Sequence, residues 1–229
     1  MAAWIEDVRD LLAFYQALGF QALPLSVPAA ASAGREKGTG SAQDMDALRS
    51  SMGDCRLCKL SGHRKNIVFG TGDPNARLML IGEAPGKEED IQGAPFVGDA
   101  GMLLTRLLLK MGLRREDVYI ANIIKCRPPM NRDPEEDEVT ACRSFVEQQI
   151  AIVRPSVIMT LGRVALQTLM NAPKLRITAA RGRFLDYNGI PVMPTFHPAY
   201  LLRNPRDKVL TWSDAQKVMA KLGLAAESD

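Results

Sequence analysis

The four cysteines of this chain have a spacing that predicts a metal centre. Cys55 and Cys58 are separated by two residues, as in a chelating pair, while Cys126 and Cys142 come from distant segments. Such a set is typical of zinc sites and of iron–sulfur clusters. A zinc ribbon usually takes its second pair from another tight pair, so the wide second spacing favours a [4Fe–4S] cluster. Two disulfides or four unrelated buried thiols are the alternatives, although disulfides suit a smaller secreted framework.

A second group of polar side chains stands where predicted strands end. Glu83 follows one apolar run, Asn122 lies near the end of the next, and His197 follows the last. Ligands of parallel sheets bind outside the carboxyl ends of the strands, so these three side chains are expected at one site. A single histidine at a strand end is more often structural than catalytic. Its convergence with Glu83 and Asn122 makes His197 a catalytic candidate.

Two glycine-rich turns accompany these residues. Gly82-Glu83-Ala84-Pro85-Gly86 breaks the first strand with a tight turn, and it lacks the pattern of a nucleotide triphosphate loop. Phe96 stands between glycines just before a predicted helix. An aromatic ring in this position either stacks on a planar ligand or packs in the ordinary way.

The segments that carry these residues alternate between strand and helix patterns. Expected strands cover residues 77–82, 118–124, 156–161 and 191–196, and expected helices cover 99–111, 134–152, 163–170 and 212–222. Continuous apolar strands that alternate with helices predict an α/β fold, in which helices cover both faces of a mostly parallel sheet. We therefore expect a three-layer α/β/α sandwich.

The N-terminal part differs in composition from the rest. Apolar residues recur at helical spacing between Trp4 and Leu18, and residues 23–43 are rich in Ala, Ser, Gly and Pro. We expect a helical extension at residues 1–22, a flexible linker at 23–43 and one domain at 44–229.

Composition narrows the class of protein without identifying it. The chain has 229 residues, a net charge of +3 and a sequence pI of about 8.7. It contains no apolar run near the roughly 18 residues that a membrane span needs, and its start lacks a signal-peptide pattern. A cytoplasmic location without membrane attachment is expected. A basic stretch (residues 174–208) and an acidic one (83–99) suit a polyanion whose neutral part enters a pocket, or are ordinary solvated faces.

The ordered motifs resemble a known family. Gly82-Glu83-Ala84-Pro85-Gly86, Pro95-Phe96-Val97-Gly98, Asn122-Ile123-Ile124-Lys125-Cys126-Arg127-Pro128 and His197-Pro198-Ala199-Tyr200-Leu201 are similar to motifs of the thermostable-type (family 4) uracil-DNA glycosylases. The resemblance covers about residues 55–222. It implies a [4Fe–4S] cluster of structural role on Cys55, Cys58, Cys126 and Cys142.

The resemblance also implies roles in excising uracil from DNA. Phe96 would stack on the flipped base, and the amide of Asn122 would read its edge. His197, neutral and donating, would stabilise negative charge on the base oxygen. The family pattern has Ala84 and Gly86 where better-known uracil glycosylases have an aspartate and a tyrosine. The water-orienting carboxylate is therefore expected to be Glu83 first and Glu89 second.

Further implied contacts complete the expected site. The turn residues Gly82, Ala84 and Gly86 would line the pocket, and Asn131 is either a pocket residue or part of an ordinary loop. Leu201 or Leu202 would fill the gap left by the flipped base, and Arg203 would contact a phosphate. The expected partner is uracil-containing DNA, single- or double-stranded, bound by a monomer. The alternative is a non-catalytic iron–sulfur or zinc protein that binds nucleic acid.

Overall fold

The computed structural model describes residues 42–224, whose strands form a six-stranded sheet in the order β1-β3-β2-β4-β6-β5. The strands are β1 Thr71–Gly72, β2 Leu78–Gly82, β3 Tyr119–Asn122, β4 Val157–Leu161, β5 Leu185–Tyr187 and β6 Ile190–Thr195. β3, β2, β4 and β6 pair in parallel, while β1 and β5 join the two edges antiparallel. The predicted mostly parallel sheet is confirmed.

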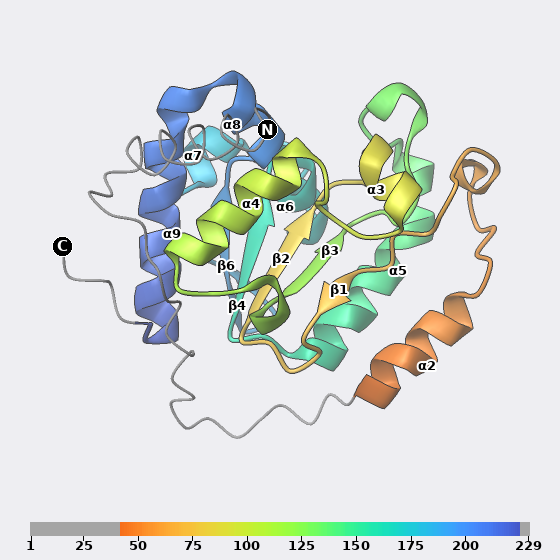
Figure 1. Cartoon of the computed structure of the whole chain (residues 1–229), viewed down its shortest axis with the longest axis horizontal. Coiled ribbons are helices and arrows are strands. Elements are labelled where there is room, and N and C mark those ends of the chain that lie inside the picture. Colours follow the sequence, from red (N-terminus) through yellow and green to blue (C-terminus); the bar gives the residue numbers. More distant parts are fainter. Residues whose placement is uncertain (1–41, 225–229) are drawn as a thin grey trace, which may run out of the picture.

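Helices cover both faces of this sheet (Figure 1). They are α2 Ala42–Met52, α3 Lys87–Gln92, α4 Asp99–Lys110, α5 Glu136–Val153, α6 Arg163–Leu169, α7 Ile177–Ala180, α8 Pro198–Arg203 and α9 Lys208–Leu222. Short 3₁₀ turns are η1 Lys59–Gly62, η2 Arg115–Asp117, η3 Pro129–Asn131 and η4 Pro205–Asp207.

Alternating side chains of the strands face two separate hydrophobic cores. Met79 and Ile81 of β2 pack in one core with α2, α5 and α6, while Leu78 and Leu80 pack in the other with α4 and α9. All four are at most 1% exposed. Each such burial contributes about 1.5–3 kcal/mol. The two cores on opposite faces confirm the three-layer α/β/α sandwich.

Several element boundaries differ from those predicted. α2 begins at Ala42, inside the predicted linker, because it buries Met45 and Leu48 and carries Asp44 in its first turn, where a negative charge favours a helix. The predicted extension at 1–22 and the remainder of the linker lie outside the described residues. α9 begins at Lys208 rather than at 212, since it continues directly from η4. Among residues 42–224, no helix combines the length and apolarity that crossing a membrane would require.

Candidate active site

The carboxyl ends of β2, β3 and β6 bring the predicted polar residues to one edge of the sheet. Gly82 pairs directly with Asn122 in the parallel register of β2 and β3, and Glu83 follows at once. His197 follows β6 and begins α8. The rings of His197 and Phe96 lie 5.7 Å apart between centroids. The convergence of these segments follows from the parallel sheet.

Asn122 presents an unused acceptor in a buried place. The residue is 1% exposed, and its Oδ1 has no hydrogen-bond partner among the described residues. A Cβ atom at Gly82 would collide with this oxygen and lie 2.5 Å from the tip of the Phe96 ring. Because position 82 is a glycine, the Asn122 amide and the Phe96 ring can both lie against it. A buried polar atom without a partner usually has a functional explanation.

Phe96 is held in a left-handed backbone conformation, with a φ of 55°. Such strain costs a bulky residue about 1–3 kcal/mol and persists only where surrounding contacts impose it. Arg115 supplies two of these contacts, donating to the carbonyl oxygens of Pro95 and Phe96 at 2.7 and 3.0 Å. Gly101 allows α4 to approach, because a Cβ there would overlap the Phe96 carbonyl. The ring is thus fixed in place before any ligand binds.

Glu89 joins the two glycine-rich turns. Its carboxylate accepts from the backbone N–H groups of Gly86, Val97 and Gly98 at 3.1, 2.9 and 3.1 Å. The side chain is 9% exposed. With both oxygens occupied by backbone amides, Glu89 positions the turn after β2 against the Phe96 loop. These contacts give Glu89 a structural role that its sequence context did not indicate, and its expected role as the second candidate for orienting water stays a prediction.

The other turn residues contribute backbone contacts and packing to this edge of the sheet. The Gly86 N–H is one of the three that Glu89 holds, and a Cβ at Gly86 would lie 2.7 Å from the Glu89 carboxylate. Ala84 is half-buried and packs against the core on the α5 side. Neither residue offers a side-chain polar group, so the predicted pocket lining by Ala84 and Gly86 consists of backbone and a methyl group.

His197 is a neutral histidine with a defined tautomer. Its Nδ1 accepts from the Ala199 N–H at 3.1 Å, which leaves the ring proton on Nε2. Burial lowers its pKa to about 4, with help from the positive charge of Arg203. The ring packs on Gly162, whose φ is +96° and whose Cβ would lie 3.0 Å from that of His197. His197 therefore offers an Nε2–H donor near neutral pH.

Glu83 has a carboxyl group with perturbed acidity. Burial and the negative charge of Asp133 raise its pKa to about 7, and the positive charge of Arg163 opposes the shift. Arg163 forms an ion pair with Asp133. A carboxyl group that titrates near neutrality at the carboxyl end of a parallel strand is a candidate for acid–base chemistry.

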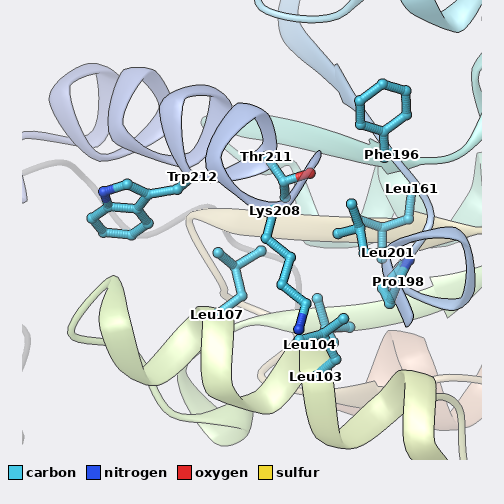
Figure 2. A pocket seen from close by; sticks show the side chains of 10 residues that line it. All are labelled: Leu103, Leu104, Leu107, Leu161, Phe196, Pro198, Leu201, Lys208, Thr211 and Trp212. Atoms are coloured by element: carbon cyan, nitrogen blue, oxygen red, sulfur yellow. The ribbon is translucent and has the colours of Figure 1, made fainter. Parts of the chain in front are cut away.

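The predicted DNA-facing residues separate into buried and exposed ones. Leu201 is 4% exposed and packs with Leu103 and Phe196, so of the two leucines predicted to fill the DNA gap it is the one engaged in the core. Figure 2 shows it among the side chains that line an apolar cavity under α8. Its neighbour Leu202 is 44% exposed, because α8 turns only one face to the core. Arg203 is exposed and close enough to act on His197 electrostatically.

Asn131 lies away from the buried part of the site. It is exposed, has a φ of 53°, and accepts from Arg127 Nε at 2.7 Å. These contacts describe an ordered loop residue whose amide oxygen is already engaged within the loop.

The four cysteines gather on one side of the sheet edge. Cys126 and Cys142 are buried in the core on the α5 side, and Cys55 and Cys58 pack against that core. All four are free thiols, so the disulfide alternative is wrong. The described residues contain no compact group of three or more His, Cys, Asp or Glu that would hold a metal ion.

Hydrogen-bond donors point at two of the sulfurs. Arg64 donates to Cys126 Sγ at 3.4 Å, and the Lys125 N–H donates to Cys142 Sγ at 3.3 Å. Burial raises the pKa of the Cys142 thiol to about 11. Donors of this kind stabilise thiolates, the form in which cysteine binds metal. The donor set therefore fits a thiolate-bound centre.

Sequence reasoning missed several residues that shape this site. Arg115 has no local signal, because its partners are carbonyl groups far along the chain. Gly162 and Arg163 could have been predicted as site residues, because they directly follow β4 at the edge where ligands of parallel sheets bind. The rule that identified Glu83 and His197 extends to this strand as well.

Comparison with known proteins agrees with this geometry. The uracil DNA glycosylase superfamily model matches residues 69–221. A type-4 uracil-DNA glycosylase of Thermotoga maritima is 49% identical over 161 residues, which cover 70% of this chain and 84% of that protein. The type-4 enzyme of Saccharolobus solfataricus is 47% identical over 187 residues, covering 78% and 87%. That of Archaeoglobus fulgidus is 40% identical over 183 residues, covering 77% and 92%. The chain therefore belongs to the type-4 family of the uracil DNA glycosylase superfamily.

Proposed function

We propose that this protein hydrolyses the N-glycosidic bond of uracil in DNA and leaves an abasic site. The buried, unpartnered Oδ1 of Asn122 beside the Phe96 ring carries this proposal. Uracil offers an N3–H to that oxygen and an O4 acceptor to the amide nitrogen. Cytosine offers the opposite pattern and would leave both amide groups unpaired, which costs binding free energy.

His197 supports the departure of the base. Cleavage leaves negative charge on the base oxygens and positive charge on the sugar. A neutral imidazole whose Nδ1 accepts from the Ala199 N–H carries its ring proton on Nε2, where it can be donated. Such a donor stabilises the developing anion at O2 more than it stabilises the neutral base, which lowers the barrier.

Glu83 acts on the sugar side in this proposal. As a carboxylate it would orient the attacking water and stabilise the positive sugar. Its raised pKa keeps it partly protonated near neutrality, so the reaction should run faster as the pH rises through about 7. The product is an abasic site, and we propose that the reaction is purely hydrolytic.

We further propose that Cys55, Cys58, Cys126 and Cys142 hold a structural [4Fe–4S] cluster. Four gathered thiols and N–H donors to the sulfurs of Cys126 and Cys142 support it. When bound, the cluster supplies iron–thiolate bonds that tie the segment around Cys55 to the end of β3 and to α5. Zinc is the competing occupant. An iron–sulfur cluster gives a broad visible absorption at about 400 nm, whereas zinc gives none.

DNA contact is assigned to α8 and its surroundings. Exposed Leu202 would fill the gap left by the flipped base, and exposed Arg203 would contact a phosphate. Binding of uracil-containing DNA as a single or a double strand, a monomeric state and a cytoplasmic location stay predictions from the sequence.

Cleavage of a synthetic oligonucleotide tests the proposed function. The protein is incubated with a single-stranded oligonucleotide that carries one uracil, and abasic sites are then cleaved with alkali. Strand scission at uracil, and none with thymine in its place, is expected. His197→Asn should lose most of this activity, while His63→Asn, at the exposed second histidine, should keep it. No scission by the wild-type protein would overturn the enzyme proposal in favour of a non-catalytic nucleic-acid-binding protein.

A further inference from the structure

A fully buried lysine lies directly behind the base-reading asparagine. Lys125 is 1% exposed, and its Nζ donates to the backbone oxygen of Asn122 at 2.8 Å and to Gln149 Oε1 at 2.6 Å. Burying an amine among apolar side chains is costly unless its hydrogen bonds are satisfied. An aliphatic side chain of similar length would fill the same space without that cost. The polar atoms therefore call for an explanation beyond packing.

The lysine completes a chain of hydrogen bonds where the sheet ladder stops. β1 begins opposite Ile120, the second residue of β3, and its pairing does not extend to Asn122. The side chain of Gln149, 0% exposed, donates to the Phe69 carbonyl at 2.9 Å and accepts from Lys125. Lys125 in turn donates to Asn122. Two side chains thus link the segment before β1 to the last residue of β3.

The backbone of Lys125 also contacts Cys142 and the segment before β1. The Lys125 N–H donates to Cys142 Sγ, and its carbonyl accepts from the Val68 N–H at 2.8 Å. Beyond Asn122 the chain is also fixed to β2, where the Ile123 N–H donates to the Gly82 carbonyl at 2.9 Å. Of these contacts, the hydrogen bond from the Lys125 amine is the one that reaches the Asn122 carbonyl from the α5 side.

We infer that Lys125, supported by Gln149, is a positioning residue that sets the place of the Asn122 amide for the base. This inference rests on the proposed function. Without the amine, both oxygens that accept from it, the Asn122 carbonyl oxygen and Gln149 Oε1, lose this donor. The end of β3 then relaxes, and the Asn122 side chain moves relative to Phe96. A displacement of about 1 Å at a reacting site costs up to roughly a hundredfold in rate.

Single-turnover kinetics of matched variants test this role. Lys125→Met keeps the length and packing of the side chain and removes both hydrogen bonds. We expect its cleavage rate on the uracil oligonucleotide to fall by roughly tenfold to a hundredfold. The concentration of DNA that gives half the maximal rate should change by less than about twofold, because the DNA-facing residues are untouched.

Position 149 offers a conservative rescue. Gln149→Met removes the acceptor and should reproduce the loss seen with Lys125→Met. Gln149→Glu keeps an acceptor for the lysine amine but loses the donor to the Phe69 carbonyl, so it should retain a higher rate than Gln149→Met. Val146→Ala, on the same helix and also 0% exposed, is the control for packing alone. It should lower thermal stability and leave the rate at 25 °C unchanged.

Visible absorption and thermal unfolding are recorded for each variant. An unchanged rate in folded Lys125→Met would overturn the inference. A rate that falls only in proportion to lost visible absorption would also overturn it, because the lysine would then act on the metal centre alone. If wild-type protein cleaves nothing, the proposed function has failed first. An active wild type with an equally active Lys125→Met shows failure of this inference only.

Discussion

A side-chain amide can discriminate between bases only when the protein leaves its hydrogen-bonding groups available. Asn122 meets this condition through burial and through the absence of an internal partner for Oδ1 among the described residues. Gly82 and Phe96 then define the plane in which a base would lie. Specificity at this scale comes from unpaired polar atoms, since each wrong base leaves them unsatisfied.

Exchanging the Asn122 amide for a carboxyl group should change the preferred base. Asn122→Asp offers an acceptor to the exocyclic amine of cytosine and, when protonated, a donor to its N3. We expect activity on uracil to fall by about a hundredfold and the ratio of cytosine to uracil cleavage to rise. Cleavage of paired oligonucleotides that differ only at this base measures the ratio. An unchanged ratio would remove Asn122 from base recognition.

Glu83 should control the acid side of the pH–rate profile. Its pKa of about 7 means that the carboxylate form is lost as the pH falls below neutrality, whereas His197, with a pKa of about 4, stays neutral throughout. The single-turnover rate should rise with pH through about 7. Glu83→Gln should be slow and independent of pH in this range. A wild-type profile that is flat between pH 5.5 and 8.5, both rough limits around that pKa, would contradict the assignment.

The same residue should reduce stability at high pH. A carboxyl group whose pKa is raised from 4.5 to about 7 binds more protons in the folded state. Stability therefore falls as the pH rises through this interval and stays lower above it. Glu83→Gln should be more stable than wild type at pH 8, on the order of 1–2 kcal/mol given partial exposure, and equal to it near pH 4. Denaturant unfolding at the two pH values measures both differences.

At the scale of elements, α8 combines a core contact with a side that faces solvent and that we propose contacts DNA. Leu201 packs into the core, and Leu202 faces solvent. Leu201→Ala should cost about 2–4 kcal/mol of unfolding free energy, as large-to-small changes in cores do. Leu202→Ala should leave stability nearly unchanged and weaken cleavage of uracil in double-stranded DNA more than in single strands. Equal effects of Leu202→Ala on both substrates would exclude it as the gap-filling residue.

The strand ends were the most predictable part of the site. Apolar runs and glycine turns predict β2, β3, β4 and β6 to within a few residues, because buried parallel strands have a clear pattern. They also predict that Glu83, Asn122 and His197 meet at one edge. Contacts between distant segments were not predictable in this way. The amides held by Glu89, the carbonyls held by Arg115 and the side of α8 that is buried depend on the assembled fold.

At the scale of the whole molecule, the four cysteines bring together the segment around Cys55, the end of β3 and α5, which the sheet does not join. Lys59 next to Cys58 forms ion pairs with Glu135 and Asp137 at the start of α5, so charge supports the same connection. Surface pairs of this kind add little stability alone. The thiolate bonds of the proposed cluster would be the stronger link between these segments.

Loss of a single cysteine should reveal this link. Cys126→Ser should abolish the visible absorption near about 400 nm and lower the thermal midpoint, because metal binding is coupled to folding. Leu57→Ser, an exposed position between Cys55 and Cys58, is the matched control and should change neither. Metal analysis of both proteins gives the iron or zinc content. Full stability of Cys126→Ser would contradict a structural metal centre.

The unequal burial of the four thiols has a consequence for how the proposed metal centre would be assembled in the cell. Cys126 and Cys142 are buried in the core, whereas Cys55 and Cys58 lie on a partly exposed segment. The two inner ligands are therefore in place as soon as the sheet and α5 have folded. A delivery protein would reach the centre from the outer pair, with the segment around Cys55 closing last. Iron insertion should then follow folding of the sheet, and the outer pair should be the first to release metal during oxidative damage.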